Sequence, residues 1–160
     1  PFFSIYFKAF KDGVAGFSSK DWKKSAENFD EAVRLSDIIF SKGWANAKQK
    51  FDTTSLMYAG YAHQNAGNKA ICAYYYKRLI DAKINSSELI DAYRYLLVYY
   101  IDTKDKLGFD TYYKITQGAY PAENWFEYKT DYIDKHYSME EKIASYNEMT
   151  ADNSMTELAC

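Results

Sequence analysis

The same helix-hairpin pattern occurs twice along this chain with identical internal spacing. Four positions of the first copy recur 47 residues later in the second copy: Gly13, Trp22, Phe29 and Ala32 correspond to Gly60, Lys69, Tyr76 and Leu79. A unit that cannot bury its apolar face alone stacks on a copy of itself, and the stack presents a long curved surface instead of a closed pocket. The repeat therefore favours a binding scaffold over an enzyme.

The composition indicates an all-α fold. Proline is scarce, with 2 residues, glycine is modest, with 7, and Ala, Lys, Leu, Tyr and Glu recur at helical spacing. A chain of this size buries about 68–70% of the surface that its unfolded state exposes, so a core can form without metals or disulfides. We predict an all-α, right-handed α-α superhelix, which is a solenoid of antiparallel helix hairpins with about eight helices.

Four hairpins are predicted, within a single repeat domain over residues 1–150. They span about 3–40, 52–83, 86–119 and 122–150, and the segment 151–160 is predicted to be a frayed tail. The predicted capping pairs at helix starts are Ser18 with Asp21, Asn85 with Glu88, and Ser138 with Glu141.

The hairpins resemble the tetratricopeptide repeat, a 34-residue helix-turn-helix module with small and aromatic residues at set positions. The first copy carries the resemblance in residues 13–17 (Gly-Val-Ala-Gly-Phe) and 20–35, and the second in 59–62 (Ala-Gly-Tyr-Ala), 67–69 (Gly-Asn-Lys) and 76–80 (Tyr-Lys-Arg-Leu-Ile). The resemblance covers roughly residues 6–150, and the last two copies are degenerate. At the small-residue position of the returning helix the four copies have Ser25, Cys72, Phe109 and Lys142. We therefore expect close helix approach in the first two hairpins and looser packing in the last two.

The resemblance implies that the outgoing helices line a concave groove. On this basis the predicted partner-binding residues are Phe7, Phe10, Met57, Tyr58, Tyr61, Arg94, Tyr95 and Tyr128. Three of the tyrosines, at positions 58, 95 and 128, occupy equivalent repeat positions and would form a ladder suited to an extended or helical peptide. The alternative is that these rings only cover the apolar seam between neighbouring helices.

One known mode of binding in this family is disfavoured. Some tetratricopeptide proteins hold a partner's C-terminal carboxylate with Lys and Asn, but the matching positions here are Phe10, Val14, Met57 and Tyr61. Arg94 has the fork geometry for a carboxylate, yet Asp91 lies within the same turn, so a structural ion pair is the favoured interpretation.

The sequence contains no constellation typical of catalysis, and we expect no enzyme activity, no metal site and no cofactor. His63 and His136 lie 73 residues apart without nearby cysteine ligands. No glycine-rich phosphate loop or nucleophile elbow occurs. Cys72 replaces a small core residue and is predicted to be inert, whereas Cys160 is predicted to be exposed.

Charge and hydropathy narrow the class of partner. Residues 122–160 carry nine acidic and three basic side chains, which disfavours nucleic acid at this end of the chain. The longest apolar run, Tyr95–Ile101, is far shorter than the roughly 20 residues that cross a bilayer, so we expect no transmembrane segment. The sequence leaves two compartments open: the cytoplasm, or the periplasm if a leader before Pro1 is removed. It also leaves the oligomeric state open.

Three functions are compatible with this pattern. The leading hypothesis is a noncatalytic protein–protein interaction scaffold that binds a peptide or protein segment in a concave, Tyr-rich groove. The second is binding of a carbohydrate or another small ligand on exposed aromatic side chains, with Trp44 and Trp125 as candidates. The third is a stack that only spaces or oligomerises the neighbouring domains of a larger protein.

Overall fold

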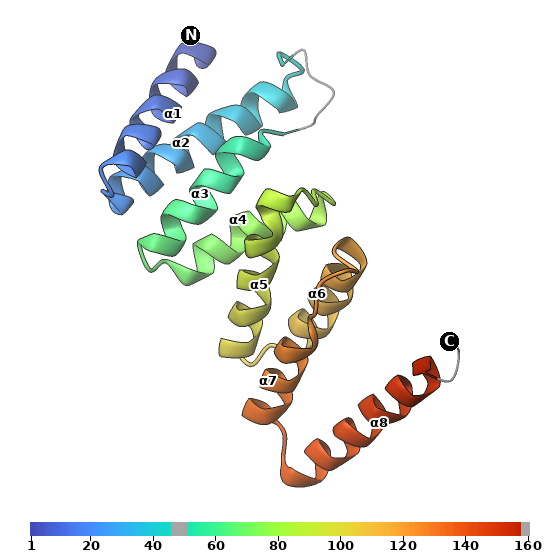
Figure 1. Ribbon diagram of the computed structural model, residues 1–160. Helices are drawn as coiled ribbons and strands as arrows, with labels where there is room; N and C mark the ends of the chain where they lie inside the picture. The colour runs from blue at the N-terminus through green and yellow to red at the C-terminus, as the bar shows by residue number, and fades with distance from the viewer. Residues whose placement is uncertain (46–50, 158–160) are drawn as a thin grey trace. The chain divides into compact units, whose positions relative to one another are not determined.

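The computed structural model describes residues 1–45 and 51–157, and these residues are all-α, as the sequence predicts (Figure 1). They contain eight α-helices, one 3₁₀ helix and no strand. The elements are α1 (Phe2–Ser18), α2 (Trp22–Ser41), α3 (Thr53–Asn65), α4 (Lys69–Asp81), the 3₁₀ helix η1 (Ser87–Leu89), α5 (Ile90–Asp102), α6 (Lys106–Ala119), α7 (Phe126–His136) and α8 (Met139–Glu157). Over these two ranges, no helix combines the length and apolarity needed to cross a bilayer.

The chain divides into two compact units. Unit 1 is Pro1–Tyr99 and unit 2 is Tyr100–Cys160, so the division lies inside α5. Unit 1 contains α1 to α4, η1 and most of α5, and unit 2 contains α6 to α8 with the end of α5. The expectation of one continuous repeat domain over residues 1–150 stays a prediction.

Within unit 1 the first four helices pack on one another in the order of the sequence. Helix α1 packs on α2, α2 on α3, and α3 on α4 (Figure 1). The buried side chains of the two returning helices, among them Phe29, Leu35, Leu79 and Ile80, form the core between these layers. This succession is consistent with the predicted superhelix of antiparallel hairpins.

The two glycines that define the repeat have matching surroundings. A Cβ atom at Gly13 of α1 would lie 3.0 Å from the ring of Phe29, and one at Gly60 of α3 would lie 2.4 Å from the ring of Tyr76. Each glycine therefore lets an aromatic ring of the returning helix lie against the outgoing backbone. The repeat inferred from the 47-residue spacing is a structural repeat in these two hairpins.

Five of the helices in the described residues end with the same backbone turn. The residue two positions past the helix has a positive φ: Lys20 (59°), Gly43 (66°), Gly67 (79°), Lys83 (59°) and Lys104 (58°). At each turn its N–H donates to the carbonyl three residues back, and the next N–H donates five residues back, which is the Schellman motif. A left-handed conformation costs an L-residue about 1–2 kcal/mol, so the three lysine turns carry a backbone strain that glycine would relieve.

One of the three predicted helix caps is confirmed, and the other two differ from the prediction. The side chain of Asp21 alone caps α2 by accepting the N–H of Lys24, because Ser18 is still in the last turn of α1. The third hairpin begins with η1, whose N-cap Ser86 makes no side-chain capping bond.

Helix α8 begins with the predicted capping box and extends beyond its predicted end. The Ser138 N–H donates to the Glu141 carboxylate at 2.8 Å, and the Glu141 N–H donates to the Ser138 hydroxyl at 3.3 Å. The predicted end near Thr150 is wrong, because α8 continues to Glu157 through a segment without glycine or proline. Of the predicted frayed tail, residues 158–160 lie outside the described residues.

In unit 2 the close helix approach occurs one residue before the predicted position. Phe109 is buried, and its ring stacks on Tyr132 of α7 with the ring centroids 4.5 Å apart. The preceding Gly108 faces Tyr100, and a Cβ at this glycine would lie 2.4 Å from that ring. Gly108 thus supplies a small residue in the third hairpin, and the looser packing expected of the last two hairpins stays a prediction.

Candidate functional site

The predicted groove residue Tyr58 belongs to an aromatic cluster that joins the first two hairpins. Its ring stacks on Phe29 with centroids 5.2 Å apart and an interplanar angle of 10°. The rings of Phe10 and Phe17 meet it edge-on at 6.2 and 5.4 Å. Tyr58 and Phe10 therefore cover the seam between the helices, which was the alternative interpretation of these positions.

Beside this cluster lies a cavity of about 370 Å³ within unit 1, which we call the aromatic pocket. Its lining residues come from α1, α3, α4, η1 and the start of α5: Phe17, Met57, Tyr58, Tyr61, Tyr76, Glu88, Leu89, Asp91 and Ala92. Tyr61 is 45% exposed, and its ring lies 5.3 Å from that of Phe17. The structure thus brings together three of the predicted binding residues, namely Met57, Tyr58 and Tyr61.

The charged residues that line the aromatic pocket are both acidic. Glu88 and Asp91 are exposed, and no lysine or arginine contributes to the lining. Arg94 donates an Nη1–H to the Asp91 carboxylate at 3.1 Å, which confirms the ion pair expected within this turn. This pair is solvent-exposed, so it neutralises Asp91 only weakly.

Tyr76 forms a buried wall of the aromatic pocket. Its hydroxyl donates to the Gln64 side-chain oxygen at 2.9 Å, and burial raises the pKa of its phenol far above the ordinary value. Tyr95 meets this ring edge-on, with centroids 5.5 Å apart. Tyr95, a predicted binding residue, therefore does not line the pocket but packs against Tyr76, which does line it and whose phenol stays neutral.

The remaining predicted residues lie elsewhere. Phe7 is 63% exposed and lines a different cavity of about 310 Å³ between α1, α2 and the start of α3. Tyr128 lies in unit 2 and packs against Trp125, with centroids 5.8 Å apart. The ladder of three tyrosines would join both units, and it stays a prediction.

One candidate for a sugar-stacking side chain is wrong. Trp125 is only 4% exposed, and its ring N–H donates to the Tyr120 carbonyl at 2.9 Å. Trp44 is 48% exposed, and its ring lies 5.3 Å from that of Phe2. A polar anchor and close packing hold Trp125 inside unit 2, and neither follows from its position in the sequence.

A polar network that the sequence did not predict ties the hairpins of unit 1 together. The Asp30 carboxylate of α2 accepts a hydrogen bond from the hydroxyl of Tyr75 at 2.7 Å and lies 2.8 Å from Nε2 of His63. About two turns further along α2, the Asp37 carboxylate accepts two hydrogen bonds from the Arg78 guanidinium, at 2.8 and 3.1 Å. The sequence contains a signal for this network, because Asp30 and Asp37 lie seven residues apart and so share one face of the helix.

This network has an Asp–His pair but lacks the geometry of a nucleophilic site. The second ring nitrogen of His63 lies 3.1 Å from the Asn68 amide, so an amide group occupies the place of a nucleophile. The histidine is buried. Among the described residues, no group of three or more His, Cys, Asp or Glu side chains is arranged to hold a metal ion.

A comparison with protein-family models, with curated proteins and with solved structures finds no match. The resemblance to the tetratricopeptide repeat therefore stays a prediction. It rests on the spacing of residues and on the glycine–ring contacts of the first two hairpins.

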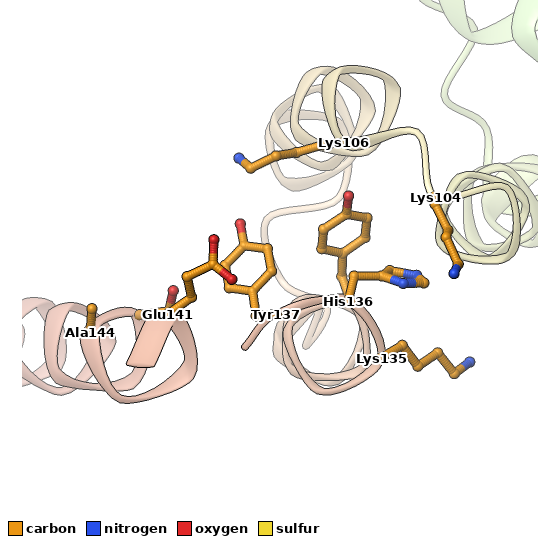
Figure 2. A pocket seen from close by; sticks show the side chains of 9 residues that line it. Lys104, Lys106, Lys135, His136, Tyr137, Glu141 and Ala144 are labelled. Atoms are coloured by element: carbon orange, nitrogen blue, oxygen red, sulfur yellow. The ribbon is translucent and has the colours of Figure 1, made fainter. Parts of the chain in front are cut away.

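Unit 2 contains a cavity of about 510 Å³, which we call the lysine pocket (Figure 2). It is lined by Lys104, Lys106, Tyr132, Lys135, His136, Tyr137, Glu141, Ala144 and Ser145. In Figure 2 the side chains of Lys104, Lys135 and His136 occupy one side of the view, Tyr137 and Glu141 the other, and Lys106 lies above them on α6. This pocket could not be predicted from the sequence, because its residues meet only when the α5–α6 turn, α6, α7 and α8 assemble.

Proposed function

We propose that this chain is a noncatalytic protein–protein interaction scaffold that binds a peptide segment in the aromatic pocket of unit 1. The observation that carries the proposal is the convergence of Met57, Tyr58 and Tyr61 with Phe17 and Tyr76 around one cavity of about 370 Å³. Rigid aromatic side chains give a large contact area for little loss of conformational entropy. The cavity volume also falls in the range of about 300–1,000 Å³ that is typical of ligand pockets.

The acidic rim indicates which peptide side chain the pocket prefers. Glu88 and Asp91 place negative charge at the edge of a cavity whose walls include tyrosine rings. A cation over such a ring gains about 0.5–2 kcal/mol, and a nearby carboxylate adds to this attraction. We therefore expect the bound segment to insert a lysine or arginine side chain between Tyr61 and Glu88.

Tyr61 is the residue whose replacement tests the site most cleanly. Tyr58 is stacked on the buried Phe29, so removing its ring would disturb the core as well as the pocket. Tyr61 is 45% exposed, and Tyr74 of α4 is 55% exposed but does not line the pocket. The two tyrosines form a matched pair of variants, one inside the site and one outside it.

Selection of a random peptide library on the 160-residue chain is the experiment. Enriched peptides are expected to carry a Lys or Arg beside apolar residues, and one of them is then synthesised. Its dissociation constant should rise about tenfold or more in Tyr61→Ser and about two- to fivefold in Glu88→Gln, and stay unchanged in Tyr74→Ser. The proposal fails if no peptide is enriched relative to a control surface that carries no protein. It also fails if Tyr74→Ser weakens binding as much as Tyr61→Ser does.

A second candidate function is self-association through α1. Its side chains Phe3, Phe7 and Val14 share one stripe of the helix and are 43%, 63% and 39% exposed. Sedimentation equilibrium of the wild type and of Phe7→Glu separates this function from the first. A wild-type dimer that the substitution dissociates would support an oligomerisation role, and a monomer in both would exclude it.

A further inference from the structure

The cavity that Phe7 lines in unit 1 has walls that are largely aromatic, and we call it the phenylalanine pocket. Its volume is about 310 Å³, and its lining includes the rings of Phe3, Phe7 and Phe40 together with Thr54 at the start of α3. Phe3 and Phe7 are 43% and 63% exposed, so solvent reaches much of this apolar surface. Exposed apolar side chains gathered around a cavity are typical of an interaction site.

The carboxylate that lines the phenylalanine pocket is already hydrogen-bonded. Asp52 accepts the Tyr6 hydroxyl at 2.6 Å and the Ser55 N–H at 3.1 Å, and it also accepts the Ser55 hydroxyl. No lysine or arginine is found among the described residues of the lining. The pocket therefore offers contact area to an apolar group and no free charge to an ion.

The phenylalanine pocket and the aromatic pocket lie along the same two helices of unit 1. On α1, Phe3 lines the first pocket and Phe17 the second, and on α3 the corresponding residues are Thr54 and Tyr61. Intervals of fourteen and seven residues bring side chains back to nearly the same face of a helix. At 1.5 Å per residue, Tyr61 lies about 10 Å along α3 from Thr54, and Phe17 lies about 15 Å along α1 from Phe7.

A continuous row of ring contacts joins the two pockets. Successive ring centroids lie between 5.2 and 6.2 Å apart, in the order Phe7, Tyr6, Phe10, Tyr58, Phe17 and Tyr61. The rings in the middle of the row, Phe10 and Tyr58, are half-buried. A chain that leaves the aromatic pocket along this row therefore reaches the phenylalanine pocket over aromatic surface.

We infer that the peptide bound in the aromatic pocket continues along this row and places a bulky apolar side chain in the phenylalanine pocket. This inference rests on the proposed function. The acidic rim formed by Glu88 and Asp91 attracts the basic side chain of the peptide, whereas the uncharged phenylalanine pocket receives the apolar one. The two anchoring side chains lie about 10–15 Å apart, which is about four residues of an extended chain or seven to ten of a helix.

Phe7 and Ile5 supply a matched pair of variants on α1. Both side chains are apolar, and they are 63% and 50% exposed, but only Phe7 lines the phenylalanine pocket. Because each side chain is at least half exposed, Phe7→Ser and Ile5→Ser should both leave the fold intact.

The test is fluorescence anisotropy with a labelled peptide selected on the 160-residue chain. We expect its dissociation constant to rise about fivefold or more in Phe7→Ser and to stay unchanged in Ile5→Ser. A second peptide, with its apolar anchor replaced by alanine, should bind the wild type and Phe7→Ser equally, but should still bind Tyr61→Ser more weakly. This cycle assigns each anchor of the peptide to its own pocket.

Failure of this inference and failure of the proposed function give different results. If Tyr61→Ser weakens binding and Phe7→Ser does not, or if Ile5→Ser weakens it as much as Phe7→Ser, the inference is overturned and the proposed function stands. If no peptide is enriched, or if Tyr61→Ser has no effect, both are overturned. A wild-type dimer that Phe7→Ser dissociates in sedimentation equilibrium would assign Phe7 to self-association and overturn the inference alone.

Discussion

Gly60 shows how a single absent methyl group sets the distance between two helices. The Tyr76 ring occupies the space where a Cβ would lie, 2.4 Å from the nearest ring atom. Tyr76 also lines the aromatic pocket, so this contact couples the packing of α3 on α4 to the shape of the proposed binding site. By contrast, a Cβ at Gly118 of α6 would meet nothing within 4 Å.

We expect Gly60→Ala to lower the free energy of unfolding by about 1–3 kcal/mol, because the ring or the helix must move. Gly118→Ala is the control, and it should raise stability by about 0.4–1 kcal/mol through the lower entropy of the unfolded chain. Urea unfolding followed by circular dichroism measures both. Equal effects of the two substitutions would contradict the close approach at Gly60.

The phenol of Tyr6 predicts a specific loss of stability at alkaline pH. Its hydroxyl donates to the Asp52 carboxylate at 2.6 Å, and burial, together with this bond, raises the pKa of Tyr6 from 10.0 to about 12. Because the folded-state pKa is the higher one, the contribution of Tyr6 to stability is complete below about pH 10 and is lost as the pH rises toward about 12.

The Tyr6→Phe variant should therefore lose less stability than the wild type over this pH window, although it is less stable at neutral pH by about 0.5–1.5 kcal/mol. Urea unfolding at a series of pH values measures how the free energy of unfolding of each protein changes with pH. Parallel slopes would show that Tyr6 titrates alike in the folded and unfolded chains.

At the scale of the elements, the local spacing of residues decides most of the fold. The hairpins of unit 1, the Gly13 and Gly60 contacts and the shared face of Met57, Tyr58 and Tyr61 could be predicted, because each depends on positions a few turns apart. The acidic rim, the burial of Trp125 and the lysine pocket could not, because they depend on which distant segments meet. Capping of α2 was predicted as a Ser18–Asp21 pair, whereas Asp21 alone caps this helix, because Ser18 is the last residue of α1.

The helix ends offer a prediction that requires no ligand. Lys20→Gly and Lys83→Gly should each raise the free energy of unfolding by about 0.5–1 kcal/mol, because glycine adopts the left-handed conformation of the Schellman turn without strain. Lys114→Gly in the interior of α6 is the control, and it should lower stability by about 1 kcal/mol. Destabilisation by Lys20→Gly and Lys83→Gly would contradict the backbone geometry of these turns.

At the scale of the whole molecule, the two units contain pockets with different lining residues. The aromatic pocket of unit 1 is lined, among the described residues, by two acidic side chains and by no lysine or arginine, whereas the lysine pocket of unit 2 is lined by three lysines and one glutamate.

Hydrogen exchange of the 160-residue chain, with and without a selected basic peptide, tests the central claim most directly. Binding in the aromatic pocket should slow amide exchange in residues 54–62 and 86–93, which contain the lining residues of α3, η1 and α5, and leave residues 104–106 and 135–141 unchanged. Slowing confined to segments outside the aromatic pocket, or no slowing at saturating peptide, would contradict the account.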